Sequence, residues 1–268
     1  MRQTRIWFLV LYLVLFIFVA NSFANVEKNI PSLQNILDEV RSTIPEKENI
    51  KFLEQMVFEI KKFYYQIQYQ KQKLQILKEV KGHFEKAVNK IEEKYDEGKE
   101  DISQSEITKL KLGLAGTLND IYQVETDLQI SRLSLSETLD NKYPPNAKLL
   151  ESDIVPIEFQ FDSFFSWLKE QSISSKENKS LLILRKSFLK VVEASKKMKL
   201  ARKSRKMTRA LLVSEVANYD FGIGASGDLF QALIIYTRVL NGYYDSVYKY
   251  NLSVAILDRD KNLRAKFH

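Results

Sequence analysis

Apolar residues recur at helical spacing over most of the chain. One stretch runs from Asn49 to about Asp96, and another runs from Gln104 to the residues before Pro144. Two more run from about Lys179 to Asp220 and from Gly227 to Arg259. At about 1.5 Å per residue, the first of these helices would be roughly 70 Å long. Helices of that length with short connections predict antiparallel, coiled-coil-like hairpins and therefore an all-α fold.

Shorter elements are predicted outside these hairpins. Ser32 to Thr43 reads as a short amphipathic helix, and Ser163 to Gln171 reads as a second one. Val155 to Phe161 alternates apolar and polar residues, as a strand does. A single strand without a partner is unstable, so an extended linker fits that segment equally well.

The two hairpins turn at similar sequences. Tyr95 to Gly98 ends the first long helix and Tyr219 to Gly222 ends the third, and three of the four positions are identical. The pattern Leu-Asn-x-x-Tyr then follows at Leu118 and again at Leu240. The ordered recurrence of turn and pattern predicts a tandem duplication of one helical hairpin.

Each turn is followed by a helix-start signal. Ser103 and Glu106 have capping-box spacing, which predicts a helix that starts at Gln104. Ser226 is the predicted N-cap of the last helix, and Asp228 lies in the first turn, near the positive end of the helix dipole.

The N-terminal residues predict an export signal. Arg2 and Arg5 precede an apolar run from Ile6 to Ala20, and small residues follow at Ser22 and Ala24. The run is shorter than the roughly 20 residues of a membrane-spanning helix, although an uncleaved anchor remains the alternative. The predicted organisation is a signal peptide (1–24), an N-terminal hairpin repeat (25–142), a linker with a short helix (143–178) and a C-terminal hairpin repeat (179–268).

Composition narrows the function. The chain has no cysteine, so it has neither disulfides nor a lipid-anchored cysteine, which suits the periplasm or outer membrane of a Gram-negative bacterium. Its net charge of +7 is concentrated in one window without acids: Lys196, Lys197, Lys199, Arg202, Lys203, Arg205, Lys206 and Arg209. Export argues against nucleic acid as a partner, and a solvated face or proximity to anionic headgroups fits better.

Nothing in the sequence indicates an enzyme. The histidines are His83 and His268, and no phosphate loop, nucleophile elbow or metal-ligand spacing is present. Acidic residues gather near the first turn from Glu92 to Asp101, but lysines interrupt them, so a solvated acidic tip is expected. We expect no cofactor and no metal.

The segments SEVANYDFGIGASGDLFQAL and GYYDSVYKYNLSVAILDRD resemble the C-terminal repeat of the TolC-like outer membrane efflux proteins. Phe52 to Leu139 resembles the N-terminal repeat more weakly. The resemblance implies a homotrimer that forms a periplasmic helical duct, working with a membrane-fusion adaptor and an inner-membrane transporter. It places Tyr219 and Asp228 at a periplasmic gate. It places the adaptor contact at Gly222, Ile223, Gly224, Ala225 and Ser226, and the first-repeat tip at Tyr95, Gly98, Ser103 and Glu106.

The chain departs from that family in one respect. Neither the residues before Phe52 nor those from Asn178 to Ser214 contain the alternating segments of a transmembrane β-barrel. The expectation is therefore a shortened, TolC-like α-barrel subunit without a clear transmembrane β-barrel. A barrel-less periplasmic coiled-coil scaffold, or a relic that no longer conducts, is the alternative.

Overall fold

The computed structural model describes residues 29–44, 50–98, 103–174 and 179–265. Four long helices dominate these ranges: α3 (Ile50–Asp96), α4 (Gln104–Thr138), α6 (Lys179–Phe221) and α7 (Ser226–Ala265). Two short helices, α2 (Leu33–Thr43) and α5 (Phe164–Glu170), accompany them, and the described ranges contain no β-strand. The all-α fold of long helical hairpins is confirmed. The expected signal peptide lies outside the described residues.

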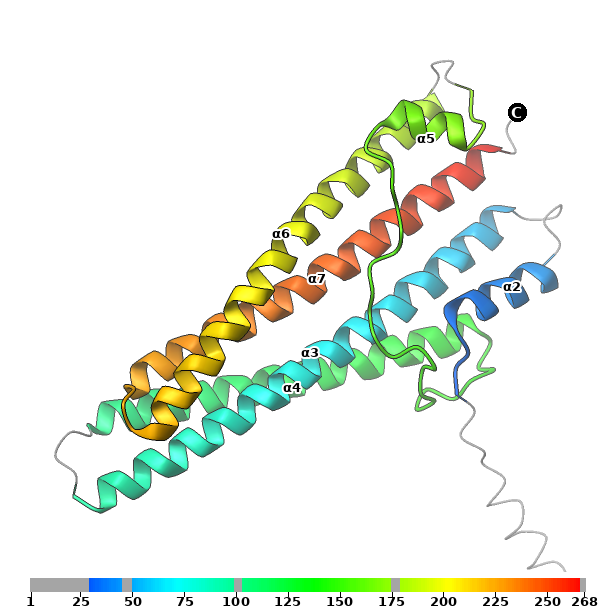
Figure 1. Ribbon diagram of the computed structural model, residues 1–268. Helices are drawn as coiled ribbons and strands as arrows, with labels where there is room; N and C mark the ends of the chain where they lie inside the picture. The colour runs from blue at the N-terminus through cyan, green and yellow to red at the C-terminus, as the bar shows by residue number, and fades with distance from the viewer. Residues whose placement is uncertain (1–28, 45–49, 99–102, 175–178, 266–268) are drawn as a thin grey trace, which may run out of the picture.

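The long helices form an open layer. α3 pairs with α4 and α6 pairs with α7, and the two hairpins meet where α3 lies along α7 (Figure 1). The order across the layer is α6–α7–α3–α4, so α6 and α4 are its edges. Both hairpin turns lie at the same end of the molecule, which we call the tip end.

Two apolar cores hold the layer together. The upper core, away from the tips, joins both hairpins to α2, α5 and the linker, and it includes Tyr64, Phe188 and Val247. The tip core joins α3, α4, α6 and α7 around residues such as Phe84 and Tyr236, both at most 1% exposed. Since each core contains side chains from both hairpins, burial of apolar surface holds the hairpins side by side.

The segment from Val155 to Phe161 is an extended linker rather than a strand. It crosses the upper half of the layer in front of α7 and α3 (Figure 1). The Asn251 side chain substitutes for a neighbouring strand: it donates to Val155 O (2.8 Å) and accepts from Ile157 N (3.0 Å). The Tyr250 hydroxyl donates to Ile157 O (3.0 Å), so two side chains of α7 satisfy part of the backbone that an isolated strand would leave unpaired.

Candidate functional site at the hairpin tips

The first tip, between α3 and α4, has the predicted local structure. Gly98 has φ +71°, a left-handed conformation that favours glycine, and its N–H donates to Tyr95 O at 3.0 Å. Ser103 caps α4 in a complete capping box: its hydroxyl accepts from Glu106 N (3.3 Å), and its own N–H donates to the Glu106 carboxylate (3.0 Å). Tyr95 is 44% exposed beside this turn.

The second tip depends on two glycines. Gly222 has φ +78°, and the carbonyl of Asn218 accepts from both Ile223 N and Gly224 N at 3.0 Å. These bonds satisfy a carbonyl that the end of α6 would otherwise leave free. A Cβ on Gly224 would lie 2.9 Å from the Asn218 Cβ, so the tight turn excludes a side chain there.

The prediction that Ser226 caps α7 is wrong. The helix begins at Ser226 itself, and the carbonyl of Ala225 accepts from Asp228 N and Leu229 N. The Ser226 hydroxyl donates instead to the Glu106 carboxylate of α4 at 2.9 Å. Two tips that are 120 residues apart in sequence are thereby joined, which no local capping rule could predict.

The Glu106 carboxylate is the centre of this junction. Its pKa is lowered from the usual value, first by the hydrogen bond from the Ser103 backbone and then by the bond from Ser226. Both bonds stabilise the charged form, and the N-terminal end of α4 adds a favourable dipole. Glu106 is therefore an anion that ties the two tips together at neutral pH.

A second junction joins α3 to the end of α6. The Lys90 ammonium donates to the carbonyls of Tyr219 (2.9 Å) and Asp220 (2.8 Å) and lies 5.1 Å from the centre of the Tyr219 ring. The Tyr219 hydroxyl donates to Ala87 O at 3.1 Å. A cation at the C-terminal carbonyls of a helix complements its dipole, so Lys90 acts as a cap supplied by another helix. We call the contacts of Lys90, Tyr219, Glu106 and Ser226 the tip latch.

The residues that the resemblance placed at a gate have different surroundings. Tyr219 is buried at 6% exposure, and burial raises the pKa of its hydroxyl, with Asp220 as the next cause. Asp228 is exposed, and its carboxylate has no hydrogen-bond partner among the residues described. Phe221 and Ile223 are 81% and 79% exposed, so the second tip ends in an apolar knob.

Lys90 is the important residue that the sequence did not reveal. It occupies an ordinary position on α3, among other lysines, and only the packing of α3 against α6 gives it a role. Among the predicted tip residues, Glu106, Ser226 and Tyr219 are brought into the latch. No hydrogen bond in the described ranges joins Tyr95 or Gly98 to the second tip.

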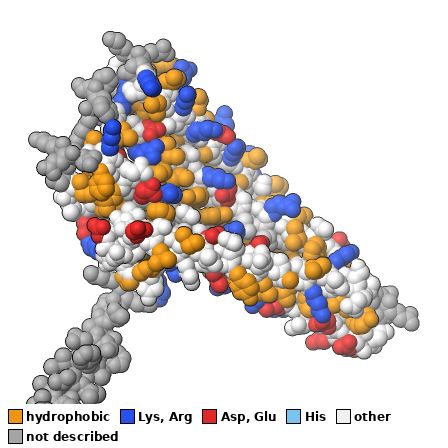
Figure 2. Space-filling view, turned by 180° about the vertical axis from the view of Figure 1, so that it is seen from behind, with side chains coloured by type: hydrophobic (Ala, Val, Ile, Leu, Met, Phe, Trp, Pro, Cys, Tyr) orange, Lys and Arg blue, Asp and Glu red, His pale blue; other side chains and the backbone are white. Residues whose placement is uncertain are grey.

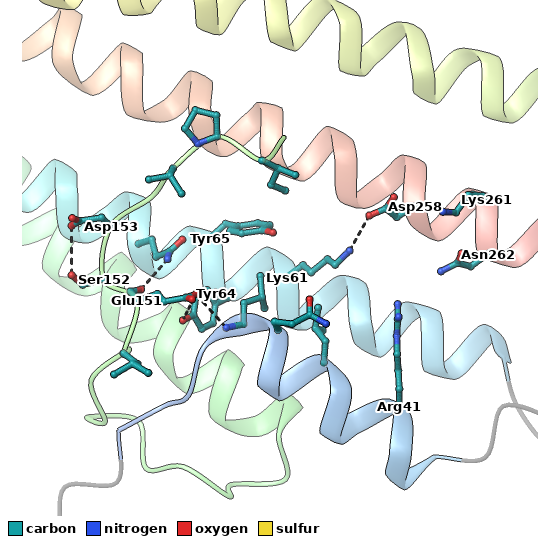
Figure 3. Close-up of a pocket in the computed structure, with 18 residues that line it drawn as sticks. Arg41, Lys61, Tyr64, Tyr65, Glu151, Ser152, Asp153, Asp258, Lys261 and Asn262 are labelled. Atoms are coloured by element: carbon teal, nitrogen blue, oxygen red, sulfur yellow. Dashed lines mark hydrogen bonds and ion pairs between the residues drawn. The ribbon is translucent and has the colours of Figure 1, made fainter. Parts of the chain in front are cut away.

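A groove of about 920 Å³ lies at the other end of the layer, between α2, α3, α7 and the linker (Figure 3). Lys61 crosses it to pair with Asp258 at 3.0 Å. Glu151 lies near Tyr64 and accepts from the Leu33 N–H at the start of α2 (3.4 Å). Because Lys61 and Asp258 pair across the groove and Glu151 bonds the start of α2, we assign the groove a role in holding α2 and the linker against α3.

The described residues contain no group of histidine and acidic side chains arranged to hold a metal ion. None of the helices in these ranges is both long and apolar enough to traverse a bilayer.

Comparison with known proteins bears on the fold. Neither a protein-family model nor a curated protein matches the chain. Among solved structures, the outer-membrane channel OprN matches with a TM-score of 0.63 at 10% identity. The match covers 78% of this chain and 66% of the OprN chain, so this chain spans just under two thirds of that channel's length. The all-α hairpin fold of this chain is therefore similar to that of OprN.

Proposed function

We propose that the chain is a subunit of an efflux channel whose long hairpins form the wall of a periplasmic duct. The observation that carries the proposal is the open layer, whose two edge helices each present an unpartnered apolar stripe. A wall segment of a tube needs such edges, because each must be covered by the next segment.

The stripe on α4 consists of Leu112, Tyr122, Ile130 and Leu133, which are 55% to 66% exposed. At 3.6 residues per turn they fall within an arc of about 80°, opposite the buried face of the helix. The stripe on α6 falls within about 40° and consists of Leu182, Leu189, Leu200, Met207 and Leu211. Their exposed fractions run from 38% to 68%. Such side chains lie open on the surface between charged ones (Figure 2).

The two stripes are on different helices, so α4 of one copy would pack on α6 of the next. This contact is heterologous, and heterologous contacts form rings when the rotation closes. A homotrimer, as the family resemblance implies, would close such a ring into a duct. The similarity of the fold to an outer-membrane channel supports this arrangement.

The tips are the proposed contact with a membrane-fusion adaptor and, through it, an inner-membrane transporter. The exposed knob of Phe221 and Ile223, with Ala225 beside it, offers apolar surface for such a contact. Ser226 is 8% exposed and its hydroxyl is used by Glu106, so its part is to hold the tip rather than to contact the adaptor.

The test is the oligomeric state of the purified chain by analytical ultracentrifugation. We expect a trimer. Met207→Glu places a charge on the α6 stripe and should weaken assembly by about tenfold or more. Ala210→Glu is the matched control, since it adds the same charge to an exposed position of α6 off the stripe. A chain that stays monomeric and binds no adaptor would instead indicate a periplasmic scaffold.

A further inference from the structure

The face of α6 that packs on α7 follows a heptad repeat that is interrupted in its middle. Its upper half supplies apolar side chains, all at most 8% exposed: Leu181, Leu184, Phe188, Val191 and Met198. Its tip half resumes the repeat with Leu212, Val216 and Tyr219. Between the two halves, the inward positions are Ala201, Arg205 and Thr208, again three and four residues apart, while Arg202 and Arg209 are exposed.

The facing helix has no such interruption. α7 maintains a buried apolar residue at alternating spacings of four and three through the whole contact, and all are at most 7% exposed: Leu229, Leu233, Tyr236, Leu240, Tyr243, Val247, Tyr250, Val254 and Leu257. The interruption is therefore a property of α6 alone. Of the basic window of the sequence, Arg205 alone is half-buried in the packing seam, and the other lysines and arginines are exposed.

Contacts at the interruption are polar and incomplete. The Arg205 guanidinium lies 4.6 Å from the centre of the Tyr243 ring and 5.9 Å from that of Tyr244. The Thr208 hydroxyl and the Asn241 side-chain oxygen are buried and have no hydrogen-bond partner in the described part of the protein. A buried polar group without a partner is destabilising, because it has lost its hydrogen bonds to water. This part of the seam therefore holds α6 on α7 less firmly than the apolar parts on either side.

The two apolar cores of the molecule also separate at this level. On α6, Met198 belongs to the upper core and Leu212 to the tip core. On α7, Leu240 belongs to the tip core and Tyr243 to the upper core. Packed interiors resist deformation, so bending is concentrated where neither core extends.

We propose that this seam break (Ala201, Arg205 and Thr208) is a hinge at which the tip half of α6 swings relative to α7. The swinging half is 210–221, which ends at the tip latch. α7 stays in place, because its own seam is continuous and it also packs along α3. The hinge proposal depends only on packing within one chain, so it does not depend on the proposed channel function.

The experiment is amide hydrogen exchange of the whole chain, read by mass spectrometry along α6. In the native sequence, residues 210–221 should exchange about tenfold faster than residues 181–198. Arg205→Leu combined with Thr208→Val completes the apolar seam and should slow exchange of 210–221 by about tenfold, leaving 181–198 unchanged. Lys203→Leu is the control, since it removes the same charge and adds the same apolar side chain on the exposed side of α6.

Three results would overturn the hinge. They are uniform exchange along native α6, equal slowing by Lys203→Leu, or equal slowing of both halves by the combined variant. If the combined variant does not fold, Thr208→Val alone is nearly isosteric and removes only the unpaired hydroxyl. It should still slow exchange of 210–221 by about threefold, and no slowing would count against the proposal.

Discussion

Lys90→Met should release the second tip from the first. The substitution keeps the length and the apolar stem of the side chain but removes the ammonium that bonds Tyr219 O (2.9 Å) and Asp220 O (2.8 Å). A hydrogen bond to a charged group contributes about 1.5–3 kcal/mol. Because Lys90 is only partly buried, we take the low end for the pair together, about 2 kcal/mol. That shifts the balance between latched and open tips by about 30-fold.

The assay is the distance between the tips, measured by double electron–electron resonance. The native sequence has no cysteine, so Asp96→Cys and Ile223→Cys introduce unique spin-label sites at the ends of α3 and α6. Both positions are exposed. Diluting the labelled chains with unlabelled ones ensures that each measured distance joins two labels of the same subunit. Lys90→Met should add a long-distance population, while α3 and α4 stay paired.

Lys86→Met is the control for this measurement. Lys86 lies one turn earlier on α3, is exposed, and makes no hydrogen bond or ion pair among the described residues. It therefore removes the same charge without touching the latch. An unchanged distance distribution in Lys90→Met, or the same change in both variants, would refute the role given to Lys90.

Two further predictions concern the same half of the molecule. The pKa of Glu106 is lowered by hydrogen bonds from Ser103 and Ser226. The stability that its carboxylate contributes is therefore fully present above the unfolded-state pKa, and it is lost as pH falls through the lower folded-state pKa. Tip exchange should accelerate in that acidic range, and Ser226→Ala should shrink the effect. Separately, Gly113→Ala places a Cβ 2.6 Å from a phenyl carbon of α3 and should cost about 1–3 kcal/mol, lowering Tm. Gly116→Ala, with open space around it, should raise Tm slightly, by less than about 1 kcal/mol of added stability.

Local signals in the sequence predicted local structure well. The capping box at Ser103, the turn at Gly98 and the extents of the long helices follow from rules that act within a few residues. Those rules failed at Ser226, because α7 begins one residue earlier than expected and Ala225 O accepts the first helical bonds. Lys90 could not be recognised either, because its role depends on which helix lies beside α3.

Arg205 shows a different limit. Seven of the eight residues in its basic window are exposed, as a solvated face predicts, but Arg205 is half-buried. The heptad register of α6 was needed to see that Arg205 falls in line with Leu184, Val191 and Met198. A charged residue at such a position lowers stability in exchange for control over packing, as polar residues do in coiled-coil seams.

The latch and the hinge lie at opposite ends of the same short stretch of α6. The latch bonds the last turn of the helix, and the seam break weakens the turns near Arg205, about 20 Å away at 1.5 Å per residue. Of the α6 stripe, Leu182, Leu189 and Leu200 lie above the hinge, Met207 lies at its level, and Leu211 lies below it. Contacts with a neighbouring copy would therefore hold the upper half of α6 whether the tip is latched or free. Only the segment that carries Leu211 would have to leave its neighbour when the tip moves, so assembly and tip opening can be controlled by different residues of one helix.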